Sequence, residues 1–372
     1  MKVGIITLFG ENYGAVLQAY ALRKKLEMLG YDAQVINYVD KDHITYGMPR
    51  IRLAKFYLRK AACLILTQNK KRRLFSAFRA KYIRFSPKRY HDFRNLKADP
   101  PMYDIYISGS DQVWNPSIFQ YDFNFLLDFV PEGKRRISYA ASFGKRTLPK
   151  GDIQRINDLL HDYDALSVRE DSGRELLKTV FGLNAQTHLD PTLLLNAGDW
   201  GGMLTGYTGK YRRGQYIVCY YMPGDRAVCN AISKIASQLN KVHGYKVIKL
   251  GMKEHYKLAL WDDYDVSAGP LDFIALFYNA SYVVTNSFHG VSFAINFNKP
   301  FFAPINSDIP KETALHERII SLVEKLGLRQ CIVPVSAGEQ LTFDTERKID
   351  YHHANMVLEG ERRCAEAYLK SI

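Results

Sequence analysis

The order of apolar and polar stretches near the start of the chain constrains the fold more than any other feature. Residues 2–8 form an apolar run of strand length, and a polar loop over residues 9–13 follows it. Apolar residues then recur every three or four positions over residues 14–29, which predicts a helix that ends at Gly30. Another apolar run occupies residues 33–38. A strand, a short loop, a helix and a second strand predict a βαβ unit with parallel strands.

The same alternation continues in two series, separated by a stretch rich in glycine and polar residues at 196–214. We therefore predict an α/β protein of two lobes, residues 1–200 and 201–345, with a final segment 346–372 whose helix returns to the first lobe. Ligands of open α/β sheets bind at the carboxyl ends of strands, so the cleft between the lobes is the expected site. The further strands predicted are 104–107, 136–141, 165–168, 215–221, 246–250, 281–285 and 300–303, and the helices are 172–180, 225–239, 270–279, 290–297 and 351–369.

Composition limits the class of protein. Of the 372 residues, 47% are hydrophobic, which is enough for packed domains. No apolar run approaches the roughly 20 residues that span a bilayer, and the first residues lack the pattern of a secretory signal. The five cysteines are scattered without metal-site spacing, so we expect a reduced, cytoplasmic protein with no metal and no organic cofactor.

Positive charge is concentrated in one segment. The net charge is +13, and residues 50–90 contain fourteen Lys or Arg residues and no Asp or Glu. Cations on one helical face, with apolar and aromatic residues between them, fit an anionic membrane surface. Nucleic acid is a weaker alternative, because no nucleic-acid-binding motif is present, and a solvated basic helix is another. The cations expected to contact a membrane or a diphosphate are Arg52, Lys55, Arg59, Lys70, Lys71, Arg72 and Arg73.

A polar sequence lies between one predicted strand and the helix that follows it. Residues 286–290 read Asn-Ser-Phe-His-Gly. A helix N-terminus after a strand presents backbone N–H groups that bind anions. Asn286 or Ser287 is suited to cap this helix, Gly290 allows another backbone to approach, and His289 can transfer protons near neutral pH. The alternative is that His289 only hydrogen-bonds the turn.

Polar residues also follow other predicted strands. One turn, which is suited to hold a phosphate but lacks the three glycines of the dinucleotide fingerprint, consists of Asn12, Tyr13 and Gly14. A second polar segment supplies Ser108, Asp111 and Gln112. The carboxylate of Asp111 is suited to orient a hydroxyl group or a water molecule, and a turn or helix-capping aspartate is the alternative. Asp190 precedes a proline, which favours an extended backbone, so we expect it only to shape the connection.

Several blocks occur together in the order found in a known family. They read Glu11-Asn-Tyr-Gly-Ala-Val-Leu-Gln18, Ser108-Gly-Ser-Asp-Gln-Val-Trp-Asn-Pro116, Tyr139-Ala-Ala-Ser-Phe-Gly144, Ser167-Val-Arg-Glu-Asp-Ser-Gly173, Leu189-Asp-Pro-Thr-Leu193 and Asn286-Ser-Phe-His-Gly290. The ordered set resembles the polysaccharide pyruvyl transferase family over about residues 1–305. The resemblance implies two Rossmann-like lobes of the glycosyltransferase-B type with a deep cleft between them. It also implies transfer of the enolpyruvyl carbons of phosphoenolpyruvate to a sugar diol, giving a ketal and phosphate.

The resemblance assigns roles to the residues above. His289 would serve the proton transfers, and the other polar residues of the three segments would contact the substrates. Family members with demonstrated pyruvylation often have Arg-Leu-His where this chain has Ser287-Phe288-His289. We therefore expect Arg169, at the end of the strand 165–168, to bind the anionic groups of the donor. The alternative pairs Arg169 with Glu170 or Asp171 at a solvated helix start.

The resemblance also suggests partners. We expect a glycan acceptor on a polyprenyl diphosphate, an enzyme bound peripherally to the cytoplasmic face of a membrane, and no nucleic acid. Two other classes of function remain as alternatives. One is a glycosyltransferase of the same two-lobed shape that uses a nucleotide sugar, and the other is a non-catalytic membrane-surface scaffold for polysaccharide assembly.

Overall fold

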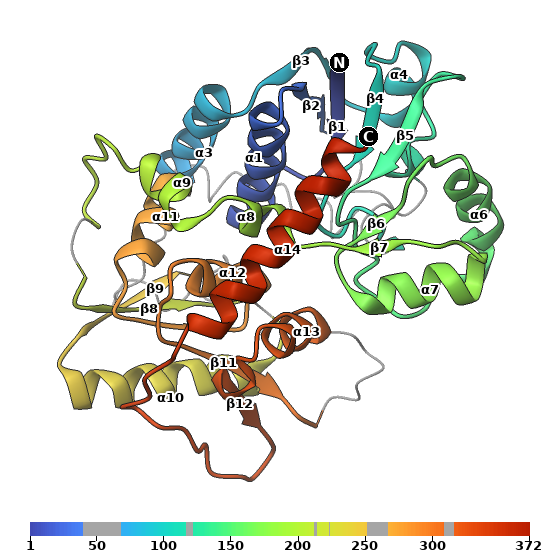
Figure 1. Ribbon diagram of the computed structural model, residues 1–372. Helices are drawn as coiled ribbons and strands as arrows, with labels where there is room; N and C mark the ends of the chain where they lie inside the picture. Colours follow the sequence, from blue (N-terminus) through green and yellow to red (C-terminus); the bar gives the residue numbers. More distant parts are fainter. Residues whose placement is uncertain (40–67, 117–121, 212–213, 223, 251–266, 309–315) are drawn as a thin grey trace, which may run out of the picture. The chain divides into compact units, whose positions relative to one another are not determined.

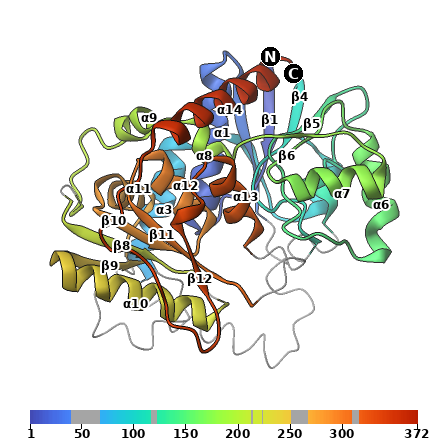
Figure 2. The same cartoon turned by 60° about the horizontal axis from the view of Figure 1, so that its bottom comes forward.

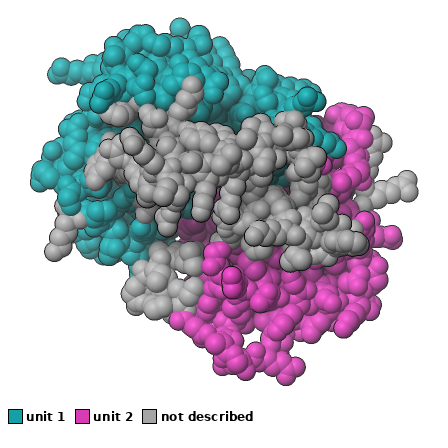
Figure 3. Space-filling view, turned by 180° about the vertical axis from the view of Figure 1, so that it is seen from behind, with its two compact units in different colours: residues 1–194, 361–372 teal, residues 195–360 magenta. Residues whose placement is uncertain are grey.

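The chain divides into two compact units in the computed structural model, which describes residues 1–39, 68–116, 122–211, 214–222, 224–250, 267–308 and 316–372 (Figure 1). Unit 1 consists of residues 1–194 and 361–372, and unit 2 consists of residues 195–360 (Figure 3). The chain passes from unit 1 to unit 2 just before the range 196–214 in which the sequence predicts the boundary. The last part of the C-terminal helix belongs to unit 1.

Unit 1 is built on a parallel sheet. Its five strands have the order β3-β2-β1-β4-β5, and every neighbouring pair is parallel. Single bridges from Ile137 to Ala165 and from Ala141 to Val168 continue the pairing from β5 to a short parallel pair, β6 and β7. The bounds are β1 Lys2–Ile6, β2 Asp32–Tyr38, β3 Phe85–Tyr90, β4 Ile105–Ser108, β5 Arg135–Ser138, β6 Ser167–Val168 and β7 Gln186–Thr187.

Two helices of unit 1 lie side by side next to this sheet, α1 and α3 (Figure 1). The ring of Tyr13 lies 5.2 Å from that of Phe75, and the ring of Tyr20 lies 6.0 Å from that of Phe78. Contacts in this order show that the two helices run in the same direction. The helices of the unit are α1 Tyr13–Met28, α3 Gln68–Tyr82, α4 Phe93–Ala98, α6 Ile153–His161, α7 Asp171–Phe181 and α8 Pro191–Leu194, with 3₁₀ turns at Phe123–Leu126 and Lys150–Asp152.

The packing of α3 and β3 corrects one expectation about the basic segment. The aromatic residues among its cations were expected to face a membrane. Instead, Phe75, Phe78 and Tyr90 are buried in the core of unit 1. The spacing of Phe75, Phe78 and Tyr82 places all three on one face of α3, and that face packs on α1. Arg52, Lys55 and Arg59 lie outside the described residues.

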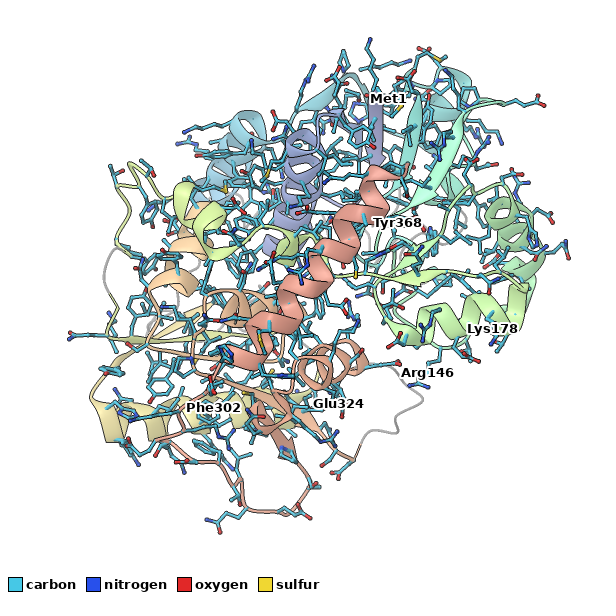
Figure 4. All side chains as sticks on the ribbon, viewed as in Figure 1. Met1, Arg146, Lys178, Phe302, Glu324 and Tyr368 are labelled. Atoms are coloured by element: carbon cyan, nitrogen blue, oxygen red, sulfur yellow. The ribbon has the colours of Figure 1, made fainter. Side chains whose placement is uncertain are left out.

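The C-terminal helix α14, His352–Lys370, is anchored to unit 1 through its last turns. The hydroxyl of Tyr368 donates to the backbone oxygen of Ser138 at the end of β5, at 2.8 Å (Figure 4). Arg362 Nε donates to the backbone oxygen of Leu193 at 2.8 Å, and the hydroxyl of Tyr31 donates to that of Leu369 at 2.9 Å. The end of α14 is therefore part of the core of unit 1.

Unit 2 is built on a second parallel sheet with helices on both faces (Figure 2). Its strand order is β12-β11-β10-β8-β9. Along β8, Ile217 and Cys219 pack in the same apolar cluster as α10, while Tyr220 contacts Phe273 of α11. The strands are β8 Tyr216–Tyr220, β9 Lys246–Leu250, β10 Tyr282–Thr285, β11 Phe301–Asn306 and β12 Ile332–Val335, and the helices are α9 Ala197–Gly202, α10 Arg226–His243, α11 Pro270–Asn279, α12 Phe288–Asn296 and α13 Glu317–Lys325, with a 3₁₀ turn at Arg329–Cys331.

The predicted α/β class and the parallel strands are confirmed in both units. The elements that the sequence prediction did not contain are α3, β3, α4, α6, β7, α8, α9, α13 and β12. In the part of the chain that the structure describes, no helix is long and apolar enough to cross a membrane.

The centre of the unit 1 sheet yields the first testable prediction. A β-carbon on Gly4 in β1 would lie 2.3 Å from Cδ2 of Tyr103. We expect Gly4→Ala to lower the free energy of unfolding by about 1–3 kcal/mol, because the ring must move within a packed core. The measurement is the urea unfolding midpoint. Gly10→Ala is the matched control, because no atom lies within 4 Å of a β-carbon there. Equal midpoints for both variants would contradict the prediction.

Candidate functional site

The carboxyl ends of the unit 1 strands bring several predicted site residues together. Asp111 follows β4, and Arg169 follows β6 directly. Arg169 Nη2 lies 3.5 Å from Asp111 Oδ1, although the two residues are far apart in the sequence. This is the edge of a parallel sheet at which α/β proteins bind ligands.

Arg169 is the centre of a buried ionic cluster. Its Nη1 donates to Asp190 Oδ2 at 2.8 Å, and its Nε lies 3.6 Å from Glu170 Oε2. The arginine side chain is only 2% exposed. Burial alone would lower the pKa of the guanidinium, but the carboxylates of Asp190, Asp111 and Glu170 raise that pKa above its ordinary value. The guanidinium therefore stays charged and is held by three carboxylates.

This geometry changes the interpretation of Arg169. The sequence analysis expected the guanidinium to bind the anionic groups of a donor, or to pair with Glu170 or Asp171 in solvent. Glu170 is a partner, but the cluster is buried, and Asp171 lies 3.2 Å from Arg174 instead. A buried guanidinium surrounded by carboxylates attracts an anion poorly, so we assign Arg169 to holding the carboxylates in place.

Asp190 is a member of the cluster that the sequence analysis treated only as part of a connection. Its side chain is fully buried and accepts hydrogen bonds from Arg169 and from Ser110 Oγ, the latter at 3.1 Å. The backbone N–H and the hydroxyl of Thr192 also donate to it, at 3.0 and 2.7 Å. Thr192 is a local partner, two residues away, whereas Ser110 is 80 residues away in the sequence and could not be identified from the local pattern.

Asp111 is the most exposed carboxylate of the cluster. Its side chain is 14% exposed, compared with 5% for Glu170 and none for Asp190. Its backbone has a φ of 74°, which is unusual for a residue other than glycine and is associated with functional sites. Asp111 is therefore the acid of this cluster best placed to meet a ligand.

The other predicted residues of unit 1 have mainly structural contacts. Ser108 is fully buried, and its hydroxyl donates to the backbone oxygen of Phe125 at 2.6 Å. Gln112 Oε1 accepts from Asn115 Nδ2 at 2.5 Å, so both side chains shape the turn after β4. Asn12 caps α1 by accepting from the N–H of Ala15 at 3.2 Å.

Tyr13 and Gly14 begin the first turn of α1. The ring of Tyr13 is buried, and Lys71 Nζ lies 4.7 Å from its centroid. The turn before α1 is thus in contact with the first turn of α3. The sequence gives no sign that the starts of α1 and α3 meet, and only the fold shows this contact.

The predicted polar sequence of unit 2 joins two neighbouring strand ends. Asn286 Oδ1 accepts from the N–H of Met222 at 2.7 Å, and its Nδ2 donates to the oxygen of Met222 at 2.9 Å. Thr285 Oγ1 donates to the oxygen of Tyr220 at 2.8 Å. Ser287 caps α12 by accepting from the N–H of Gly290 at 3.4 Å. A β-carbon on Gly290 would lie 2.5 Å from Thr285 Oγ1, so this glycine allows close packing of helix and strand.

His289 occupies the first turn of α12 at this strand edge. It is 8% exposed, and its ring meets the edge of the Phe288 ring at 5.4 Å between centroids. The guanidinium carbon of Arg318 lies 6.0 Å from the centroid of the same phenylalanine ring. A histidine and a cation therefore flank Phe288 next to a helix N-terminus, which is an arrangement suited to an anion.

A second polar group of unit 2 was not found by sequence reasoning. Asp225 caps α10 and accepts from Asn306 Nδ2 at 2.6 Å, at the end of β11. His316 is near this carboxylate, and burial lowers its pKa while Asp225 opposes the change. Among the described residues, no group of three or more His, Cys, Asp or Glu is arranged to hold a metal ion.

Comparisons with known proteins identify a family over most of the chain. The family described as polysaccharide pyruvyl transferase matches residues 12–308. No curated protein matches the chain.

Several solved structures are similar to the chain at low identity. UDP-GlcNAc 2-epimerase from Methanocaldococcus jannaschii is 11% identical, with a TM-score of 0.49, over 96% of this chain and 98% of that one. Arabidopsis thaliana UGT89C1 with UDP is 11% identical, with a TM-score of 0.45, over 100% and 93%. E. coli heptosyltransferase WaaC with ADP is 12% identical, with a TM-score of 0.40, over 89% and 99%. The sheet topologies above, rather than these neighbours, establish the class of the fold.

The ionic cluster yields a stability prediction. We expect Asp190→Ala to lower the free energy of unfolding by about 3–5 kcal/mol, because it removes the closest partner of a buried charge. The measurement is the urea unfolding midpoint. Asp99→Ala is the control, because Asp99 pairs with Lys88 at the surface and such pairs contribute little. A midpoint for Asp190→Ala equal to that of the control would show that Arg169 does not depend on Asp190.

Proposed function

Because the chain belongs to the polysaccharide pyruvyl transferase family, we propose that it moves the enolpyruvyl carbons of phosphoenolpyruvate onto two hydroxyls of a sugar. In this reaction the vinyl carbon gains a proton and becomes a methyl group. The two sugar oxygens bond to the neighbouring carbon, whose bond to the phosphate oxygen breaks. One hydroxyl proton balances the proton gained by the vinyl carbon, and the other leaves with phosphate or solvent. The proposal depends on one observation above all: a histidine in the first turn of α12, within the residues that the family matches.

The groups around Phe288 suit the donor. The first turn of α12 presents N–H groups to an anion, and Arg318 adds a positive charge beside the same ring. His289 can then protonate the vinyl carbon as a general acid and stabilise the anion before that step. In this proposal Arg318, and not Arg169 as expected from the sequence, is the cation that binds the donor.

The Asp111 carboxylate suits the acceptor. A sugar hydroxyl donates well to an ionised carboxylate, and Asp111 has the greatest exposure of the three acids around Arg169. Hydrogen bonding to Asp111 would orient the hydroxyl or the water that removes its proton. In this proposal Arg169 is a positioning residue.

We propose a glycan precursor on a polyprenyl diphosphate as the acceptor and peripheral binding to the cytoplasmic face of a membrane. Residues 50–90, which contain fourteen Lys or Arg residues and no Asp or Glu, support an electrostatic contact with anionic lipid. Burial of Phe75, Phe78 and Tyr90 removes these rings from any such contact. We propose that the reaction needs no metal or organic cofactor.

The role of His289 is tested by substitution. We expect His289→Ala to lower kcat by roughly 10²–10⁴-fold, as loss of a general acid does. The measurement is phosphate release from phosphoenolpyruvate in the presence of a glycan acceptor. His352→Ala is the control, because this histidine is exposed on α14. If the His289 variant turned over as fast as the control, His289 would not be the general acid. Activity with nucleotide sugars and none with phosphoenolpyruvate would favour a glycosyltransferase.

The role of Arg318 is tested separately. We expect Arg318→Ala to raise the KM for phosphoenolpyruvate by roughly ten- to a hundredfold, because it removes a charge-assisted contact with an anion. Arg347→Ala is a matched control, since its guanidinium carbon also lies over a phenylalanine ring, that of Phe302, at 5.6 Å. The same KM in both variants would show that the donor does not contact Arg318.

A further inference from the structure

Four consecutive cations begin the first described helix after β2. We call Lys70, Lys71, Arg72 and Arg73, in the first turns of α3, the basic block. Arg72 Nε lies 3.2 Å from Glu11 Oε1, and Lys71 Nζ lies 4.7 Å from the ring centroid of Tyr13. Glu11 belongs to the connection between β1 and α1, and Tyr13 is the first residue of α1. The basic block is therefore fixed against one particular loop.

That loop lies at the carboxyl edge of the unit 1 sheet. The connection from β1 to α1 leaves this edge, and Asp111 follows the neighbouring strand β4 at the same edge. Since α1 and α3 run in the same direction side by side, both helices begin there (Figure 1). The opposite end of α3 holds another lysine, Lys81, which is about 16 Å away along the helix from Lys70.

We propose that the basic block binds the diphosphate of the acceptor substrate, an inference that rests on the proposed function. Residues 50–90 contain no Asp or Glu, and Glu11 of the neighbouring loop pairs with Arg72. A diphosphate ester carries more than one negative charge and offers several acceptor oxygens. Lys71 is held over the Tyr13 ring with its ammonium group at the loop, and Lys70 is exposed in the first turn. Lysine binds phosphate well as a point charge.

A membrane surface explains this placement less well. Binding to a bilayer by charge depends on the number of exposed cations near the surface, and it does not require contact with the loop after β1. The rings that could add insertion, Phe75 and Phe78, are buried against α1. A substrate phosphate, by contrast, must lie at the edge of the sheet where the acceptor groups are. Position along α3 therefore separates the two possibilities.

Lys71 and Lys81 form a matched pair for the test. Both belong to α3, and Lys81 Nζ lies 5.0 Å from the ring centroid of Tyr82, much as Lys71 lies over Tyr13. Replacing either lysine with serine removes the same charge and a comparable ring contact. Lys71 is half-buried and also lies 5.6 Å from the Phe75 ring, whereas Lys81 is exposed. The two lysines are about 15 Å apart along the helix, which exceeds the screening length of about 8 Å at physiological salt.

The experiment uses the full chain and two probes. Binding of inorganic pyrophosphate is measured by calorimetry, and binding to phosphatidylglycerol–phosphatidylcholine vesicles is measured by co-sedimentation at the same salt concentration. We expect Lys71→Ser to weaken pyrophosphate binding roughly tenfold and Lys81→Ser to weaken it less than about twofold. Lys71→Arg should retain most of the binding. Both serine variants should change vesicle binding equally or not at all.

Other outcomes overturn the inference. If pyrophosphate does not bind the wild-type chain, there is no local phosphate site at the basic block. The same conclusion follows if both serine variants weaken pyrophosphate binding equally. A loss of vesicle binding confined to Lys71→Ser, with pyrophosphate binding unchanged, would assign the block to the membrane. A lower melting temperature would reveal that Lys71→Ser is unfolded. In that case, pyrophosphate binding by Lys71→Arg is compared with binding by Lys81→Ser. None of these measurements uses phosphoenolpyruvate, so a failure of the pyruvyl transfer assay is distinguishable from a failure here.

Discussion

The ion pairs of Arg169 are the interaction on which the carboxyl edge of the unit 1 sheet depends. A guanidinium that is 2% exposed has lost its hydration, and only nearby carboxylates can compensate for that loss. Asp190, Asp111 and Glu170 come from different segments, so the ionic contacts hold the chain after β4, after β6 and before α8 in one arrangement. Compensation of the buried charge also decides which acid remains accessible: Asp111 keeps the greatest exposure, because Asp190 is enclosed by Arg169, Ser110 and Thr192.

In unit 2, the ends of β8 and β10 are joined by neutral hydrogen bonds instead. The amide of Asn286 both accepts from and donates to the backbone of Met222, and Thr285 bonds the oxygen of Tyr220. Such contacts fix the end of β10 against the end of β8 without placing a carboxylate there. The carboxylate of this edge lies at the next strand end instead, where Asp225, after β8, accepts from Asn306 at the end of β11.

The sequence predicted the parts of the fold that depend on local pattern. The strands over 2–8 and 33–38 and the helix between them correspond to β1, β2 and α1, and Gly30 has the positive φ of 90° that a helix-ending glycine adopts. The segment after residue 67 was interpreted from its charge, and the aromatic stripe of Phe75, Phe78 and Tyr82 was the better signal for its packing. The partners of Arg169 could not be predicted in the same way, because Asp190 is 21 residues away in the sequence. The pairing of β6 with β7 brings Arg169 and Asp190 to the same sheet edge, and bridges from Ala141 to Asp111 and to Val168 bring Asp111 beside them. The positive φ of Asp111 likewise has no local sequence signature.

The burial of α12 has a consequence for the timescale of motion around His289. All nine residues of the helix are buried, and Phe293 contacts both Trp200 and Phe273. Because no side of this helix faces solvent, we expect its amide hydrogens to be among the slowest to exchange in unit 2. We therefore expect conformational adjustments around His289 during turnover to leave the backbone of α12 intact.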